Sequence, residues 1–273
     1  MALFQSKNVL ITGASSGIGE SLAKEFAFQG ANLVLMARRK SRLDEVKAEL
    51  KQNYPSINIL TFETDVTLDN SVANSVKLAL AEMGNLDVVV ANAGFGVAGN
   101  VSQLSLEDYR RQFETNLFGV LRIIKETIAT LKSTQGRLAV VGSVNGYVSL
   151  PGISAYAISK FGVRALCDAL YHELKPDGIS VTHIAPGFVV SEIRRVNNRG
   201  EFREKAKDPI PLWLQMESSI AAKKILKSIY YRRRERVITG HGWWIVRLAR
   251  FFPGVLFFLI RFFNIKARME PKV

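Results

Sequence analysis

Short apolar runs alternate with segments of helical periodicity along most of this 273-residue chain. The apolar runs predict seven strands, at 8–11, 32–36, 57–62, 86–90, 138–141, 180–184 and 236–239. Helical patterns lie between them, at 20–29, 42–52, 72–83, 106–131 and 217–231, and a further helix carries residues 156–167. Strands that alternate with helices of this length pair in parallel, because each helix returns the chain along one face of the sheet. We therefore predict an α/β fold with a single doubly wound parallel sheet of about seven strands and helices on both faces.

The first predicted strand leads directly into a glycine-rich turn with the spacing G-x-x-x-G-x-G, and a helix follows. Glycine lets a phosphate approach backbone N–H groups closely, and the N-terminus of a helix adds partial positive charge. A strand, a glycine turn and a helix in this order are typical of Rossmann-type dinucleotide-binding folds. The residues predicted to bind the pyrophosphate are Gly13, Ser15, Ser16, Gly17, Ile18 and Gly19.

The residues after the second strand bear on which nicotinamide cofactor would bind. About 20 residues beyond the glycine turn, an acidic residue recognises the ribose of NAD, whereas an arginine accommodates the 2′-phosphate of NADP. The chain has Arg38 and Arg39 at this point and no acid. We predict that NADPH is preferred over NADH. The alternative is that the two arginines are solvated charges at the start of a helix.

The next two strands also end in residues that suit a nucleotide. Asp65 and Val66 follow the third strand and are placed to contact the adenine. Asn92, Ala93 and Gly94 follow the fourth strand. Parallel strands present their carboxyl ends at one edge of the sheet, so these residues are expected near the glycine turn.

A hydroxyl, a phenol and an amine follow the fifth strand. Tyr156 and Lys160 are four residues apart, so on a helix they share a face, one turn from each other. A neighbouring ammonium favours the phenolate and is expected to lower the pKa of Tyr156 towards the range of proton exchange at neutral pH. Ser143 lies just after the strand and is expected at its carboxyl end. A Tyr-x-x-x-Lys pair alone occurs on many helices, so its assignment depends on the accompanying motifs.

Together these motifs resemble the short-chain dehydrogenase/reductase family, in its single-domain form, over roughly residues 5–240. The motifs, in the family's order and approximate spacing, are Thr12-Gly13 with Gly17-Ile18-Gly19, Asn92-Ala93-Gly94, Asn116, Ser143, Tyr156 with Lys160, and Pro186-Gly187. Ala91 and Ser191 depart from the pattern, since an asparagine and a threonine are common at these positions. Neither departure removes a group needed for the chemistry.

The resemblance implies a role for each catalytic residue. Tyr156 would be the general acid in carbonyl reduction, and Lys160 would lower its pKa while bonding the nicotinamide ribose. Ser143 would polarise the carbonyl, and Asn116 would hold a water molecule for proton relay. Hydride transfer to a ketone builds negative charge on its oxygen, so hydrogen-bond donors and a proton source are needed there. The resemblance further implies cofactor contacts from Pro186, Gly187 and Ser191, and a homo-oligomer.

Charge is distributed unevenly along the chain, whose net charge is +13. Residues 1–190 hold 18 basic and 17 acidic side chains, and residues 191–273 hold 19 and 7. We predict a catalytic domain over 1–240, with a substrate-covering segment at 192–215, and an apolar, basic C-terminal extension over 241–273. The excess of basic residues points to an anionic partner for the extension. Nucleic acid is not predicted, because the basic residues alternate with bulky apolar ones.

The extension contains aromatic residues flanked by basic ones. Its longest uncharged run, 251–260, contains Pro-Gly and is shorter than the ~20 apolar residues of a membrane span. We predict peripheral or monotopic membrane attachment, in which the aromatic rings enter the headgroup region. The basic residues that would meet anionic lipid are Arg247, Arg250, Arg261, Lys266 and Arg268. The alternatives are packing on the domain itself, packing across a homodimer, or a re-entrant or full span together with neighbouring segments. Because strand-like sequence begins near residue 8, we expect the cytoplasmic side.

The histidines and the cysteine do not indicate a metal site or a disulfide. The histidines, His172, His183 and His241, are scattered, so no metal site is predicted. Cys167 is the one cysteine, which excludes an intramolecular disulfide, and core packing is its predicted role.

We therefore predict an NADPH-dependent oxidoreductase that transfers a hydride between the nicotinamide and a carbonyl or secondary alcohol. Its predicted substrate is hydrophobic and lipid-derived, which is inferred from the extension alone. A small soluble ketone is an alternative substrate. A non-catalytic NADPH-binding scaffold is the alternative from another class. A sugar epimerase would use the same Tyr and Lys, but its relatives usually carry a larger C-terminal domain.

Overall fold

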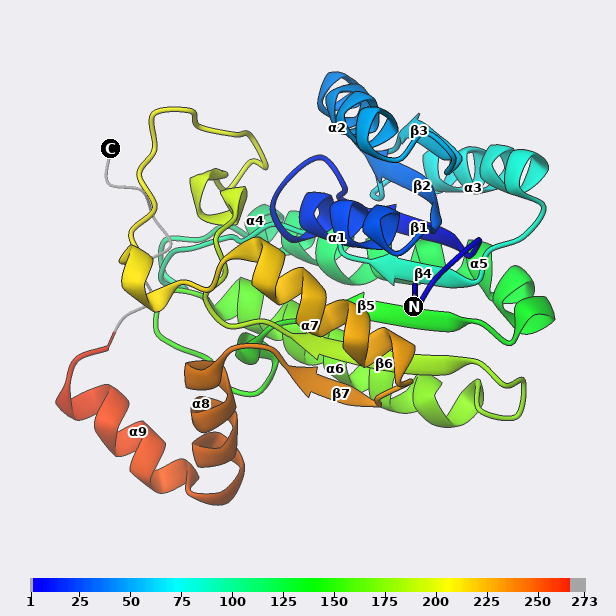
Figure 1. Cartoon of the computed structure of the whole chain (residues 1–273). Helices are drawn as coiled ribbons and strands as arrows, with labels where there is room; N and C mark the ends of the chain where they lie inside the picture. The colour runs from blue at the N-terminus through cyan, green and yellow to red at the C-terminus, as the bar shows by residue number, and fades with distance from the viewer. Residues whose placement is uncertain (1, 266–273) are drawn as a thin grey trace.

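The structure, a computed structural model, describes residues 2–265. Seven parallel strands form one sheet in the order β3-β2-β1-β4-β5-β6-β7, which confirms the predicted fold class (Figure 1). The strands are β1 (Asn8–Thr12), β2 (Asn32–Ala37), β3 (Ile59–Glu63), β4 (Val88–Ala91), β5 (Arg137–Val141), β6 (Ser180–Ala185) and β7 (Glu235–Val237). The order reverses between β1 and β4. At such a point the loops after the two strands diverge and leave a crevice at their carboxyl ends.

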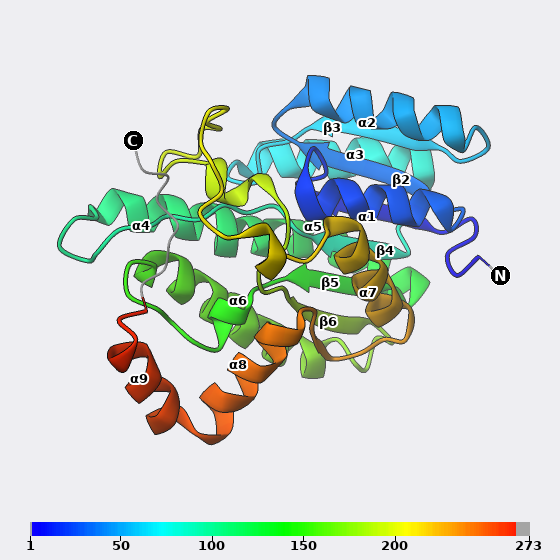
Figure 2. The same ribbon diagram turned by 60° about the vertical axis from the view of Figure 1, so that its left-hand side comes forward.

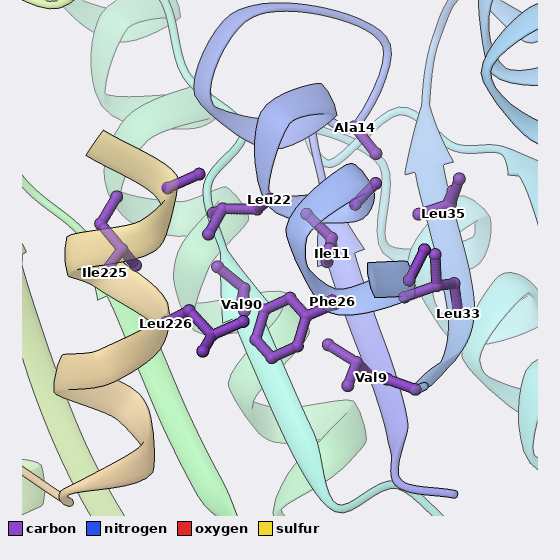
Figure 3. Close-up of a cluster of buried hydrophobic side chains, with 14 of the residues drawn as sticks. Val9, Ile11, Ala14, Leu22, Phe26, Leu33, Leu35, Val90, Ile225 and Leu226 are labelled. Atoms are coloured by element: carbon purple, nitrogen blue, oxygen red, sulfur yellow. The ribbon is translucent and has the colours of Figure 1, made fainter. Parts of the chain in front are cut away.

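Helices cover both faces of the sheet, as predicted. One face carries α1 (Gly17–Phe28), α2 (Lys40–Asn53) and α7 (Ser218–Tyr230), and the other carries α3 (Asp69–Met83), α5 (Gly119–Thr134) and α6 (Ser154–Glu173). Each layer buries its own apolar cluster, because the strands are covered on both sides and are apolar on both sides. Figure 3 shows the first cluster, where Phe26 of α1 and Leu226 of α7 meet Val9 and Val90 of the sheet.

The helix predicted over 106–131 is not a single regular helix. It consists of α4 (Leu106–Phe113), a π-helical turn at Glu114–Phe118, and α5. Asn116 lies in the π turn, is completely buried, and bonds the backbone of Phe95 on both sides: its Oδ1 accepts from the N–H at 3.1 Å, and its Nδ2 donates to the carbonyl oxygen at 3.0 Å. The extra residue of a π turn aims the Asn116 side chain at this loop, which helical periodicity alone does not predict.

The chain after β7 forms two further helices, α8 (Gly240–Phe251) and α9 (Pro253–Phe262). β7 ends at Val237, two residues before the predicted end, because the Thr239 hydroxyl accepts a hydrogen bond from the Gly242 N–H and caps α8. The two helices form a V beside this edge of the molecule (Figures 1 and 2). In residues 2–265, no helix combines the length and apolar character that a bilayer crossing would need.

Candidate active site

A cavity of about 870 Å³ lies at the carboxyl ends of β1 to β6. Both the glycine turn and the Tyr156–Lys160 pair line it, so the predicted nucleotide-binding and catalytic residues share one space. Of the predicted site residues, the cavity is lined by Gly13, Ser15, Ser16, Gly17, Ile18, Arg38, Arg39, Asp65, Val66, Asn92, Ala93, Gly94, Ser143, Tyr156, Lys160, Pro186, Gly187 and Ser191. Gly19 and Asn116 lie behind its wall and support residues that line it.

The glycine turn has a backbone that side chains would disrupt. Gly13 and Gly17 have φ values of +65° and +57°, in the left-handed region that favours glycine. A Cβ on Gly13 would lie 2.9 Å from the Cα of Ala93, and a Cβ on Gly19 would lie 2.2 Å from the carbonyl oxygen of Gly13. The turn therefore approaches the loop after β4 closely, and Gly19 lets the first turn of α1 pack against it.

Hydrogen bonds fix the loop after β4 to the end of β1. The Thr12 hydroxyl accepts from the N–H groups of Asn92 and Ala93, each at 3.0 Å. The Asn92 side chain donates to the carbonyl oxygens of Thr12 at 2.9 Å and Gly13 at 3.3 Å. These bonds hold the two sides of the crevice together where the strand order reverses.

Arg38 and Arg39 lie at the end of β2 and line the cavity; Arg38 is exposed and Arg39 is partly buried, and both make contacts with other segments. Arg39 Nη2 donates to the Ser15 hydroxyl at 3.2 Å and pairs with the Glu192 carboxylate at 2.7 Å. Arg38 Nη2 donates to the carbonyl oxygen of Gly200 at 3.0 Å. Arg39 thus connects the glycine turn to the segment after β6, and Arg38 contacts the same segment.

Asp65 follows β3 on the same side of the cavity. Its Oδ1 accepts from the backbone N–H and the hydroxyl of Thr67, at 2.9 and 2.7 Å. One carboxylate oxygen is thus committed to the turn, which positions Asp65 and the adjacent Val66 at the cavity wall.

Tyr156 and Lys160 lie one turn apart near the start of α6, as their spacing predicts. Both are almost completely buried. Lys160 Nζ donates to the carbonyl oxygen of Val141, at the end of β5, at 2.9 Å, and lies 5.8 Å from the centre of the Tyr156 ring. Burial lowers the pKa of Lys160 to about 8, because a buried ammonium loses its hydration.

The prediction that the pKa of Tyr156 is lowered is wrong, because in the structure this pKa lies above its ordinary value. Burial raises it, and a hydrogen bond with the Ser143 hydroxyl and the charge of Arg194 oppose the rise only in part. The spacing of Tyr156 and Lys160 predicted their proximity but not the direction of the Lys160 ammonium, which points to the Val141 carbonyl oxygen. The spacing also does not indicate how deeply Tyr156 is buried, and burial has the largest influence on the pKa of its phenol.

Ser143 and Asn116, the other two predicted catalytic residues, have different surroundings. The Ser143 side chain lies after β5, where its hydroxyl accepts from the Asn145 N–H at 3.1 Å and keeps its own proton for another acceptor. Both N–H bonds of the Asn116 amide are engaged, one with Phe95 and one with the Ser159 hydroxyl at 3.2 Å. A Cβ on Gly94 would meet both Asn116 Oδ1 and Lys160 Nζ, at 3.0 and 3.8 Å, so Gly94 lies between them.

The remaining cavity wall is largely apolar and comes partly from α8 and α9. Its apolar residues include Val144, Val148, Leu150, Ile153, Phe188, Leu214, Ile245, Leu256, Ile260 and Ile265. Of these, only Leu214 lies in a segment that was predicted, from the sequence, to be near the substrate. A weak signal existed, since Leu256 and Ile260 are four residues apart and share a face of α9. His241 connects α8 to the site, because its ring stacks on Phe188 and its Nε2 accepts from the Phe188 N–H at 3.1 Å.

Arg194, in the predicted covering segment, also lines the cavity and was not among the predicted site residues. Its side chain is only 7% exposed and lines the cavity. Its Nε donates to both carboxylate oxygens of Asp208, at 2.8 and 2.9 Å, and its Nη2 donates to the Gln215 amide oxygen at 2.9 Å. These bonds join the two ends of the 192–215 segment over the cavity. A charged residue in a polar stretch gave no sign of burial.

Cys167 packs in the apolar cluster of α3, α5 and α6, where burial raises the pKa of its thiol to about 12. The thiol therefore stays protonated at neutral pH, which fits the predicted packing role. Within residues 2–265, no three His, Cys, Asp or Glu side chains come together in a group that could hold a metal ion.

Known proteins match this chain over most of its length. The sequence model of the family described as short chain dehydrogenase matches residues 7–201. An uncharacterized oxidoreductase of Mycobacterium tuberculosis is 40% identical over 189 residues, which cover 68% of this chain and 75% of that protein. The 11-beta-hydroxysteroid dehydrogenase A of Sesamum indicum is 32% identical over an alignment of 277 positions, gaps included, which covers 97% of this chain and 78% of that protein.

Solved structures share the fold. The alcohol dehydrogenase of the archaeon Thermococcus sibiricus, complexed with 5-hydroxy-NADP, matches with a TM-score of 0.74 at 29% identity, over 85% of this chain and 96% of that chain. A short chain dehydrogenase/reductase from Burkholderia phymatum in complex with NAD matches with a TM-score of 0.80 at 24% identity, over 91% and 94%. One neighbour carries an NADP derivative and the other carries NAD, so the likeness does not discriminate between the two cofactors.

Proposed function

Because this chain belongs to the short-chain dehydrogenase/reductase family of NAD(P)-dependent oxidoreductases, we propose that it transfers a hydride between NADP(H) and a carbonyl or secondary alcohol of a hydrophobic, lipid-derived substrate. One observation carries the proposal: a single cavity is lined by the Tyr156–Lys160 pair, by Arg38 and Arg39, and by apolar side chains of α8 and α9.

The residues present fit a dinucleotide. The glycine turn lines the cavity, and α1 begins within it at Gly17 with no side-chain cap, so the N-terminus of this helix would face phosphate oxygens. The glycine turn would hold the pyrophosphate, Asp65 and Val66 the adenine end, and Lys160 the nicotinamide ribose. When bound, the cofactor supplies or accepts the hydride.

The chain's own residues manage the proton and the charge on the oxygen. Ser143 and Tyr156 provide two O–H donors where negative charge develops on a carbonyl that is being reduced. Tyr156 donates its proton to that oxygen, and its raised pKa keeps the phenol protonated until the more basic alkoxide oxygen develops. The charge of Arg194, which favours the ionised form of Tyr156, and the Lys160 ammonium, 5.8 Å from the centre of its ring, would stabilise the phenolate that results. In the oxidising direction the same groups take the proton back.

The preference for NADP rests on the end of β2. Arg38, Arg39 and the Ser15 hydroxyl bring two positive charges and a donor to one corner of the cavity. A 2′-phosphate suits guanidinium groups, whereas a ribose hydroxyl gains little from them. Replacing both arginines by alanine should weaken NADP+ binding and leave NAD+ binding nearly unchanged, as calorimetric titration would measure.

The substrate class rests on the cavity wall. Ile245 of α8 and Leu256 and Ile260 of α9 line the same space as Ser143 and Tyr156. Burial of apolar surface stabilises a bound apolar molecule by about 25 cal/mol per Å², so this wall favours long or polycyclic ketones over small ones. The aligned steroid dehydrogenase of Sesamum indicum, which matches 97% of this chain, supports a polycyclic or long-chain substrate.

Membrane attachment on the cytoplasmic side is part of the proposal. Seven aromatic side chains of α8, α9 and the residues beside them are 62–70% exposed, namely Trp244, Phe251, Phe252, Phe257, Phe258, Phe262 and Phe263. Arg247, Arg250 and Arg261 lie among them in the chain, a pattern that suits the headgroup region. Lys266 and Arg268, which were predicted to contribute, lie outside the described residues.

The activity test is oxidation of NADPH, with NADH in parallel, by purified protein in detergent or lipid. The ketones range from small to long-chain and steroidal, and Tyr156→Phe is the control. We expect turnover that requires Tyr156, is faster with NADPH, and is confined to the larger ketones. Turnover of small ketones alone would reject the substrate class. Tight NADP+ binding with no turnover of any ketone would favour the scaffold alternative.

The attachment test is flotation with vesicles that contain phosphatidylserine. We expect Phe258→Asp combined with Phe262→Asp to reduce flotation, because these stacked, exposed rings would enter the bilayer interface. Phe28→Asp, on α1, is the matched control, since Phe28 is 65% exposed on another face. Equal flotation of all variants would reject attachment through α9. Dissociation of an oligomer in the double variant, without loss of flotation, would assign the aromatic surface to self-association.

A further inference from the structure

The two arginines assigned to the 2′-phosphate also hold the segment over the cavity. Arg39 pairs with the Glu192 carboxylate at 2.7 Å, and its guanidinium lies 5.8 Å from the centre of the Phe202 ring. Arg38 donates to the carbonyl oxygen of Gly200 at 3.0 Å. Three points of the 192–215 segment thus touch the end of β2, and Figure 2 shows this segment as the yellow loop beside the start of α2.

Glu192 introduces a negative charge at this point. Its carboxylate lies against Arg39, on the same guanidinium nitrogen, Nη2, that donates to Ser15. A bound 2′-phosphate would bring a second anion to the same guanidinium. Two anions repel each other at close range, and a phosphate carries the greater charge. The phosphate is therefore expected to displace the carboxylate.

We propose that Glu192 is a specificity-determining residue for the cofactor: its carboxylate competes with the 2′-phosphate for Arg39, and NADP(H) releases this contact of the covering segment whereas NAD(H) leaves it in place. This inference rests on the proposed preference for NADP. It assigns to the covering segment a response to the 2′-phosphate, in addition to its place over the substrate.

The size of the competition is set by the exposure of the pair. The Arg39 and Glu192 side chains are 37% and 30% exposed, so water and salt screen their attraction. Exposed ion pairs of this kind contribute little to stability, so little free energy is needed to separate Glu192 from Arg39. Repulsion between the carboxylate and the phosphate further weakens NADP+ binding. Removing the charge of Glu192 should therefore tighten NADP+ binding by about three- to tenfold. NAD+ has no phosphate at this position, and its affinity should change by less than about twofold.

The first experiment is calorimetric titration of the full chain with NADP+ and with NAD+, for the wild type and Glu192→Gln. Glu204→Gln is the matched control, because Glu204 is an exposed carboxylate of the same segment and its replacement changes the net charge equally. We expect tighter NADP+ binding in Glu192→Gln alone. Unchanged or weaker NADP+ binding in Glu192→Gln would overturn the proposal, since the carboxylate would then be a surface charge or would orient Arg39 for the phosphate.

The second experiment reads the segment directly by limited trypsin digestion, which cleaves after exposed residues such as Arg203 and Lys205. NADP+ should raise the cleavage rate of the wild type above the rate with NAD+, because the Glu192 contact is released, and this difference should disappear in Glu192→Gln. Equal rates with both nucleotides in the wild type would also overturn the proposal.

Failure of the NADP assignment itself looks different. In that case the wild type would bind NAD+ as tightly as NADP+, and alanine at both arginines would not weaken NADP+ binding. A wild type that prefers NADP+, loses the preference without the arginines, and is unaffected by Glu192→Gln would reject the role of Glu192 alone.

Discussion

The buried ammonium of Lys160 should lower the free energy of unfolding of the protein. In an unfolded chain its ordinary pKa is 10.5, and burial lowers this to about 8 in the folded protein. Between these values the unfolded chain binds more protons than the folded one, so the stability of the folded protein rises with pH there. Below pH 8 the folded protein bears the full cost of burying a charged ammonium. At 1.36 kcal/mol for each pKa unit, the difference corresponds to about 3 kcal/mol.

Lys160→Met removes that penalty and keeps a side chain of similar length. It also removes the hydrogen bond to the Val141 carbonyl oxygen, which should cost about 1–2 kcal/mol because a buried acceptor is left without a donor. At pH 7 the variant should therefore be more stable than the wild type by about 1–2 kcal/mol. By pH 10, where most of the penalty has disappeared from the wild type, this advantage should fall by about 2.5 kcal/mol and reverse.

The assay is urea unfolding followed by circular dichroism at pH 7, 8, 9 and 10, with the free energy of unfolding extrapolated to zero urea for both proteins. The difference between the two proteins isolates Lys160 from the other groups that titrate in this range. A difference that stays constant from pH 7 to 10 would refute the reasoning, as would a variant less stable than the wild type at pH 7. Turnover should be lost in the variant at every pH.

Three further predictions follow from the fold and the covering segment. Phe26→Ala should cost about 3–5 kcal/mol in urea unfolding, since Phe26 is completely buried and meets Phe4 edge-on at 4.9 Å. Gly13→Ala should lower the melting temperature and weaken NADP+ binding, because a left-handed φ costs about 1–2 kcal/mol and the new Cβ would press on Ala93. Burial opposes ionisation of Asp208, but hydrogen bonds from Arg194 and the Ile210 N–H hold its pKa below the usual 3.8. This stabilisation is present above pH 3.8 and is lost as the pH falls through the folded pKa. Asp208→Asn should therefore speed trypsin cleavage within 192–215 at pH 7.

The fold could be predicted from sequence because its signals are local and repeated. Apolar runs and helical periodicity recur along the chain, and the right-handed crossover rule leaves few arrangements for them. The predicted glycine turn and three of the predicted catalytic residues, Ser143, Tyr156 and Lys160, also meet in one cavity, because the carboxyl ends of parallel strands lie at one edge whatever the sequence between them.

Features that depend on contacts between distant segments could not be predicted. The π turn at Glu114–Phe118 depends on how Asn116 reaches the backbone of Phe95. Burial of Arg194 depends on Asp208 and Gln215, which are 14 and 21 residues away. The pKa of Tyr156 depends on the extent of its burial and on the direction of Lys160, and helical spacing specifies neither.

The C-terminal extension shows why two alternatives from sequence need not exclude each other. Membrane attachment and packing on the domain are alternatives only if the extension has one apolar face. In the structure, Val246 and Leu256 pack with Val144 and Val148, next to Ser143, while rings such as Phe258 remain exposed. The turn at Pro253 makes this possible, since it lets two short helices present different faces where one long helix would present one stripe. Leu256 and Ile260 line the same cavity as Tyr156, so α9 contributes to the cavity wall and also carries exposed rings.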